Sequence, residues 1–173
     1  MLNQLLLNEL KEFIEREIIE LPSHSYGMPK LAIDSKELSK AQLDDKFEFE
    51  FDRFIDTHRK PGFRENLFFY IDRSGLTDAE VYKRACIDRR HFSKIRSNPH
   101  YQIGKHTVIA LSFALRLNED QCEYLLNTAG YSLSLSDEFD LAVRFFILRK
   151  LYDINYINLY LEKLNMKLVG NMI

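Results

Sequence analysis

Apolar residues recur at helical spacing along most of this chain. In the first 21 residues they are three or four positions apart, with charged residues on the other faces, and this pattern predicts an amphipathic helix. Its apolar positions are Leu7, Leu10, Ile14, Ile18 and Leu21. Such a helix needs a surface that covers its apolar face. Two interpretations remain open: a dimerisation helix, and a helix that folds back on the core of its own chain.

The pattern weakens after this first helix. Residues 22–30, PSHSYGMPK, contain two prolines and a glycine and predict a linker. Farther along, Phe47, Phe49 and Phe51 alternate with glutamates as they would in a strand, but Phe47 and Phe51 also share one face of a helix. We interpret this segment as helical. Residues 1–60 are therefore expected to form an N-terminal helical arm and linker.

The central part of the chain, residues 61–131, predicts a compact helical domain. Gly75 is a helix stop signal, Thr77 and Glu80 have the spacing of a capping box, and Asp88 is a good N-cap. The predicted helices span residues 64–74, 77–85 and 89–96.

Two further helices are expected in a C-terminal extension, residues 132–173. One starts near Ser136 and the other at Asp153, and both are rich in aromatic and aliphatic residues. We expect part of this apolar surface to pack on the central helical domain, and the remainder to form a homodimer surface. The predicted fold class is all-α.

Composition agrees with this fold and narrows the class of protein. The chain has 173 residues, of which 46% are hydrophobic, and only six glycines and four prolines, which favours one helical core over a turn-rich β architecture. The two cysteines, Cys86 and Cys122, have no CxxC pairing, so neither a disulfide framework nor a zinc site is indicated. A cytoplasmic protein is the simplest interpretation. No segment approaches the roughly 20 apolar residues that span a bilayer.

The sequence gives little support for an enzyme. It contains no Gly-rich phosphate loop, no GxSxG motif and no HExxH pair, and its five histidines have no metal-ligand spacing. We therefore expect no catalytic activity, no cofactor and no metal.

Charge is concentrated in residues 77–106, which carry seven Lys/Arg and three acids in a chain whose net charge is −2. Two short helices joined by a tight turn, the second densely basic, are typical of a helix-turn-helix DNA reader. Phe92 and Ile95 are expected to anchor the second helix. Its opposite face carries four candidate DNA-binding residues: Arg89, Arg90, His91 and Lys94.

The loop and helix start that follow supply further candidates for contact with phosphate. These residues are Tyr101, Gln102, Lys105 and His106. Arg96 lies at the end of the basic helix, where the helix dipole favours a cation. We expect it to have a structural role, paired with a carboxylate such as Asp72 or Glu80.

The motif resembles the lambda-repressor-like (Cro/C1-type) helix-turn-helix family. Val81, Ile87, Phe92 and Ile95 match its buried positions. The resemblance covers about residues 63–131 and implies a five-helix fold, in which residues 105–117 and 118–129 are the fourth and fifth helices. A narrower resemblance is carried by IDRRHFSKIRSN, TVIALSFAL, AGYSLS and YDINYIN. These stretches are similar to a bacterial module of poorly defined role, found alone or behind other domains, including macro domains.

Two residues depart from the pattern of the wider family. Tyr82 stands where a small Ala is usual, and this implies a shifted crossing of the two helices. Cys86 stands where the turn usually has Gly, so either the turn is rebuilt or backbone strain of about 1 kcal/mol is tolerated.

These observations predict a cytoplasmic, sequence-specific DNA-binding protein, a homodimeric transcriptional regulator that reads the major groove of double-stranded DNA with residues 89–96. The alternative is a protein-interaction module on a helix-turn-helix scaffold, without DNA binding, in a bacterial stress or phage-defence system. In that case the basic face binds an acidic protein partner.

Overall fold

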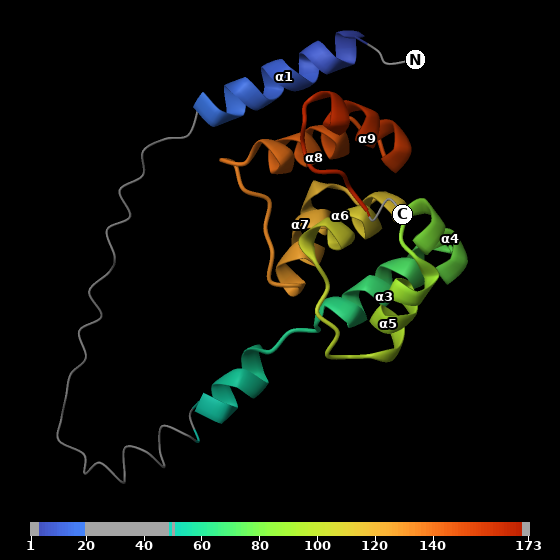
Figure 1. The fold of residues 1–173 in the computed structure, drawn as a ribbon. Helices are drawn as coiled ribbons and strands as arrows, with labels where there is room; N and C mark the ends of the chain where they lie inside the picture. The colour runs from blue at the N-terminus through green and yellow to red at the C-terminus, as the bar shows by residue number, and fades with distance from the viewer. Residues whose placement is uncertain (1–3, 20–48, 50, 171–173) are drawn as a thin grey trace, which may run out of the picture. The chain divides into compact units, whose positions relative to one another are not determined.

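The computed structural model describes residues 4–19, 49 and 51–170, and all regular structure in these residues is helical (Figure 1). The all-α prediction is therefore confirmed for this part of the chain. Two compact units are distinguished, one made of Met1–Leu21 with Pro61–Ile173 and the other of Pro22–Lys60. The first helix and the C-terminal helices belong to the same unit as the central ones.

Helix α1, Gln4–Ile19, packs on α8, Glu138–Leu148 (Figure 1). The predicted apolar positions Leu7, Leu10 and Ile14 are buried, and the ring centroids of Phe13 and Phe145 are 5.3 Å apart. An ion pair of 2.8 Å between Glu9 and Arg149 borders the contact. Of the two interpretations of this helix, the structure supports the one in which it folds back on its own chain.

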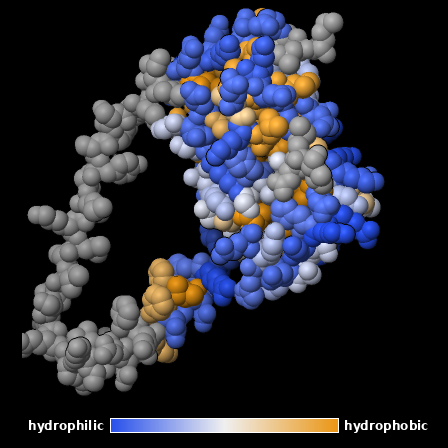
Figure 2. All heavy atoms as spheres, in the orientation of Figure 1, coloured by the Kyte–Doolittle hydropathy of each residue, from blue (hydrophilic) through white to orange (hydrophobic). Residues whose placement is uncertain are grey.

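The second unit is described only at residue 49 and from residue 51 onward. Residues 51–58 form a helix, as interpreted from the phenylalanine pattern. Phe51, Phe54 and Ile55 are exposed on it, and Figure 2 shows its apolar side chains in orange. The predicted linker, residues 22–30, lies outside the described residues.

Five helices follow in the order that the sequence predicted. They are α3 (Phe63–Ser74), α4 (Asp78–Arg84), α5 (Arg89–Ser97), α6 (Lys105–Ala114) and α7 (Glu119–Thr128). Gly75 ends α3 with a φ of 69°, the left-handed conformation in which glycine has no steric penalty. Helix α6 is the centre of the core, since it is buried at every residue from Thr107 to Ala114 and packs on α4, α7 and α9.

The C-terminal extension is part of the same core. Helix α9, Ile154–Lys163, begins at the predicted N-cap Asp153. Helix α8 begins after Asp137, next to the expected Ser136, and Asp137 accepts a hydrogen bond from the backbone N of Asp140. The buried amide of Asn158 exchanges two hydrogen bonds of 2.9 and 3.0 Å with the backbone of Val169. These bonds fix the segment after α9 against the helices.

This last segment also reaches the turn between α4 and α5. Gly170 has a φ of +79°, and a Cβ atom at this position would lie 2.9 Å from the carbonyl oxygen of Ala85. Glycine is required here because it has no Cβ atom and because it adopts a positive φ without a steric penalty. The C-terminal segment is therefore packed directly on the turn between α4 and α5.

Candidate nucleic-acid interface

The first motif helix, α4, begins where the sequence predicted. Thr77 Oγ1 accepts a hydrogen bond from the Glu80 backbone, and the Glu80 carboxylate accepts one of 2.8 Å from the Thr77 backbone. This capping box satisfies two backbone donors at the helix start. Val81 and Ala85 are fully buried, so the apolar side of α4 faces the core and its charged side faces solvent.

The turn after α4 keeps its tight geometry without a glycine. Cys86 has a φ of 51°, so it takes the left-handed conformation itself. Of the two alternatives for this residue, the turn thus tolerates the strain, of about 1 kcal/mol. The Cys86 thiol also donates a hydrogen bond to Asn155 Oδ1 over 3.8 Å, which connects the turn to α9. Burial raises the pKa of this thiol, and the charge of Asp153 raises it further.

Tyr82, the other departure from the family pattern, is half-buried between the two motif helices. Its ring centroid lies 5.9 Å from that of Phe92, with the planes inclined by 50°. The two rings therefore pack against each other where α4 meets α5.

Helix α5 is fixed at its start and along its inner face. The carboxylate of Asp88 accepts hydrogen bonds from the backbone N–H groups of Arg90 and His91, at 2.7 and 3.4 Å. The anchors Phe92 and Ile95 are each only 3% exposed. The predicted N-cap and both predicted core positions are thus confirmed.

The outer face of α5 carries three exposed cations, Arg89, Arg90 and Lys94. Their side chains make no hydrogen bond or ion pair with any residue in the described part of the chain. Arg89 and Arg90 lie in the first turn, where the helix dipole disfavours positive charge. An anion brought to this face would offset that cost.

His91 and Tyr101 lie together beside these cations. Their ring centroids are 5.7 Å apart in an edge-to-face arrangement. Burial lowers the pKa of His91, Lys94 lowers it further, and Asp88 opposes the shift. His91 and Tyr101 are half-buried, whereas Gln102 in the same loop is exposed. Four of the predicted residues are therefore grouped on α5, and two more lie in the loop that follows it.

Arg96 has the structural role that was expected, but both of its proposed partners were wrong. It donates from Nε and Nη2 to the two carboxylate oxygens of Asp78, at 2.5 and 2.6 Å. Asp72 affects Arg96 only through its charge, and the carboxylate of Glu80 is engaged by Thr77. The bidentate pair joins the end of α5 to the start of α4.

A second arginine strengthens this junction from α3. Arg64 donates two hydrogen bonds, of 2.9 and 2.5 Å, to the carbonyl oxygen of Arg96. The ring of Phe68 lies below both guanidinium groups, at 4.3 Å from that of Arg96 and 5.6 Å from that of Arg64. The three helices α3, α4 and α5 are thereby held together at the end of the basic helix.

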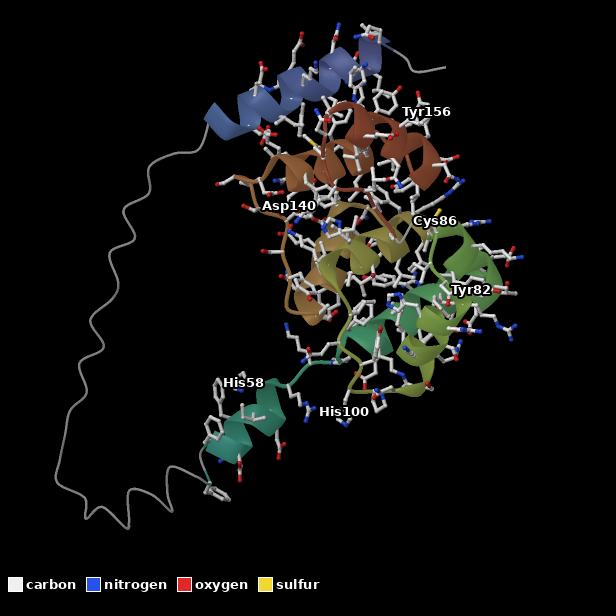
Figure 3. All side chains as sticks on the ribbon, viewed as in Figure 1. His58, Tyr82, Cys86, His100, Asp140 and Tyr156 are labelled. Carbon is white, nitrogen blue, oxygen red and sulfur yellow. The ribbon has the colours of Figure 1, made fainter. Side chains whose placement is uncertain are left out.

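Lys105 and His106 are engaged elsewhere, with residues of the C-terminal extension. The Lys105 ammonium is 2.5 Å from the buried carboxylate of Asp140 (Figure 3). His106 is bonded to the carbonyl oxygen of Leu168 over 3.2 Å and packs on Phe139 at 4.5 Å. The structure gives these two candidates packing partners and does not group them with the cations of α5.

Sequence reasoning passed over Lys83 and Arg84 as possible site residues. They extend from the solvent side of α4, over which Figure 2 shows strongly hydrophilic side chains. Both lie in the basic segment, residues 77–106, and this position was the signal in the sequence that could have identified them.

The described residues contain no group of three or more His, Cys, Asp or Glu side chains that could hold a metal ion. None of the helices in this part of the chain combines the length and the apolar content needed to cross a bilayer. The chain has no significant match among protein-family models, curated proteins or solved structures.

Proposed function

We propose that this protein is a sequence-specific DNA-binding transcriptional regulator and that α5 is its recognition helix. The observation that carries the proposal is the set of three exposed side chains Arg89, Arg90 and Lys94. Each lacks an ion-pair or hydrogen-bond partner among the residues that the structure describes, and all three lie on a helix whose opposite side is anchored by Phe92 and Ile95.

The geometry of α5 suits insertion into the major groove of B-DNA. That groove admits an α-helix, and arginine pairs with the edge of guanine through two hydrogen bonds. In helix-turn-helix proteins the N-terminal residues of the recognition helix contact the bases, and Arg89 and Arg90 occupy this end of α5. Lys94, one turn farther along, is placed for a phosphate contact.

Rigidity supports the same proposal. A reading helix must be presented in a fixed orientation, because a small misplacement loses the base contacts. The Asp78–Arg96 pair and the hydrogen bonds from Arg64 hold the end of α5, and Asp88 fixes its start. We propose that α3 to α7 form a lambda-repressor-like core, in which these contacts compensate for the departures at Tyr82 and Cys86.

We further propose that the protein acts as a homodimer in the cytoplasm. A single short helix covers few base pairs, whereas two copies read two half-sites one DNA turn apart. Leu148 and Leu159, on α8 and α9, remain about half exposed, at 51% and 46%, and these are candidate contacts between copies. A monomeric mass in light scattering at micromolar concentration, with and without DNA, would contradict the dimer.

Enrichment of a random duplex library tests sequence-specific binding. The full chain is incubated with the library at low salt, bound duplexes are amplified over several rounds, and affinities for the enriched site and for a scrambled site are measured. We expect Arg90→Ala to weaken binding to the enriched site by about tenfold or more, and to weaken binding to the scrambled site much less. The control variant Lys163→Ala removes an exposed lysine from the far end of α9 and should change neither.

Two results would overturn the proposal. One is a library that yields no enriched sequence, together with no duplex binding at low salt. The other is an Arg90→Ala variant whose affinity falls by the same factor for the enriched and the scrambled site. Equal losses would show that the basic face binds DNA through its charge alone, without sequence specificity. A basic face that binds an acidic protein and no DNA would give the first result.

A further inference from the structure

A groove on the helical unit is lined by residues that the DNA-binding proposal does not use. It has a volume of about 720 Å³ and lies where the ends of α4 and α6 meet the loop between α8 and α9. The groove is next to the Cys86 turn, whose thiol contacts Asn155 on the groove wall. Figure 3 labels both Cys86 and Tyr156, the residue after Asn155, which also lines the groove. This volume falls in the range of about 300–1,000 Å³ that is usual for small-molecule sites.

Positive charge predominates in this groove. Four of its lining residues are basic and one is acidic, Asp153, which gives the lining a net charge of +3 in a chain with a net charge of −2. The basic residues are Lys83, Arg84, Arg116 and Lys150. All four are exposed, and their side chains form no hydrogen bond or ion pair within residues 4–19, 49 and 51–170. The carboxylate of Asp153 is occupied by the backbone N–H of Tyr156 at 3.1 Å.

Two of these cations occupy strained backbone positions. Arg116 and Lys150 follow the ends of α6 and α8 and have φ values of 52° and 56°. Glycine or asparagine is usual at such helix ends, and a larger side chain costs about 1 kcal/mol. Both ends place a long basic side chain on the same groove, although glycine would fit the backbone better. Strain of this kind is found preferentially at binding sites.

Aromatic rings complete the lining. Tyr152 and Tyr156 are half-buried and line the groove. Tyr152 packs on Phe113 with ring centroids 6.3 Å apart, and the hydroxyl of Tyr156 is bonded to that of Tyr160 at 2.7 Å. These contacts fix the two rings in place. Burial raises the pKa of Tyr152, whereas the positive charge of Arg116 opposes the rise.

We propose that this groove binds a nucleotide, with its phosphates on Lys83, Arg84, Arg116 and Lys150 and its base against Tyr152 or Tyr156. A cluster of unpaired cations binds phosphate oxygens through charge-assisted hydrogen bonds, and aromatic side chains stack on bases of any sequence. The site is separate from the outer face of α5 and does not depend on the proposed DNA binding.

Isothermal titration of the full chain with ATP, GTP, CTP and UTP, in the absence of DNA, tests this proposal. We expect at least one nucleotide to bind with a micromolar dissociation constant. Arg116→Gln and Lys150→Gln keep most of the side chain and remove the charge, and each should weaken binding by about tenfold. The matched control Lys163→Gln removes a lysine outside the groove and should have no effect.

The contribution of the base is tested with inorganic tripolyphosphate as a second probe. Tyr152→Leu should weaken binding of the preferred nucleotide by about tenfold and leave tripolyphosphate binding unchanged. The proposal is wrong if none of the four nucleotides binds at millimolar concentration, or if Lys163→Gln has the same effect as the groove variants. It is also wrong if Lys150→Gln reduces only duplex DNA binding, because the groove would then hold the DNA backbone.

Discussion

The ion pair between Lys105 and Asp140 gives the sharpest test of how this core is held together. Asp140 is 2% exposed in its side chain, and its Oδ2 accepts hydrogen bonds from Lys105 Nζ at 2.5 Å and from the Ser134 backbone at 2.7 Å. In the variant Lys105→Met the side chain stays unbranched, is one atom shorter and loses its charge. The carboxylate of Asp140 then remains buried without its counter-charge.

The magnitude follows from the burial of the two groups. Removal of one partner from a buried ion pair costs about 3–5 kcal/mol. The side chain of Lys105 is 26% exposed, which places the expected loss at the lower end, about 3 kcal/mol in the free energy of unfolding. For a chain of this size that corresponds to a fall in Tm of about 6–12 °C.

Urea and thermal unfolding, followed by circular dichroism, measure this loss, and a double-mutant cycle isolates the pair. Asp140→Asn retains an acceptor for the Ser134 backbone, so the double variant Lys105→Met/Asp140→Asn should lose much less than the sum of the two single losses. A loss below about 1 kcal/mol for Lys105→Met, the value typical of an exposed pair, would refute the structural role of Lys105. At a temperature where the Lys105→Met variant is folded, its affinity for DNA should equal that of the parent protein.

Three further predictions concern the motif and its support. Gly170→Ala should lower the free energy of unfolding by about 1–2 kcal/mol in urea titrations. The new Cβ would meet the carbonyl oxygen of Ala85 at 2.9 Å, and the φ of +79° disfavours a side chain. An unchanged midpoint would show that the C-terminal segment is not packed on the turn. Cys86→Gly should raise the free energy of unfolding by up to about 1 kcal/mol by relieving the φ of 51°, and a loss of stability would argue against a left-handed turn residue. Burial and the charge of Lys94 lower the pKa of His91 in the folded state. The contribution of His91 to stability is therefore present above the unfolded pKa of about 6.5, and it is lost as the pH falls through the lower folded pKa. Unfolding at pH 7.5 and 5.5 should therefore show a smaller acid loss in His91→Gln than in the parent, and equal losses would contradict the assignment.

The helix starts were the most predictable part of this structure. Thr77, Asp88 and Asp153 were identified as caps, and each accepts the expected backbone hydrogen bond. A cap is a local interaction between residues two or three positions apart. Its signal is therefore present in the sequence, and the same holds for the anchors Phe92 and Ile95, whose spacing reports a helix face.

The partners of charged residues were not predictable in this way. Lys105 was expected at a phosphate because it opens a helix after a loop, and nothing near it in the sequence indicates Asp140, which is 35 residues away. Arg96 pairs with Asp78, 18 residues away, in preference to the two carboxylates that sequence reasoning favoured. Such pairs are determined by how the helices pack, which hydrophobic periodicity does not specify.

The positions of exposed site residues were only partly predictable from the sequence. Sequence reasoning placed Arg89, Arg90 and Lys94 on an outer face, and the structure leaves them exposed there. It did not find the groove lined by Arg116 and Lys150, because these residues follow two helices that are separate in the sequence. A site assembled from several helix ends becomes visible only when the helices are packed.

The salt dependence of duplex DNA binding tests the central claim most directly. Fluorescence anisotropy of the enriched duplex, at salt concentrations from about 50 to about 200 mM, gives the slope of log affinity against log salt. We predict that the triple variant Arg89→Ala/Arg90→Ala/Lys94→Ala has a slope shallower by about 1, because it loses the one phosphate contact assigned to Lys94 and each such contact contributes about 0.9, while Lys163→Ala keeps the parental slope. No binding by the parent protein at the lowest salt, or an unchanged slope in the triple variant, would contradict the claim that α5 is the DNA-reading helix.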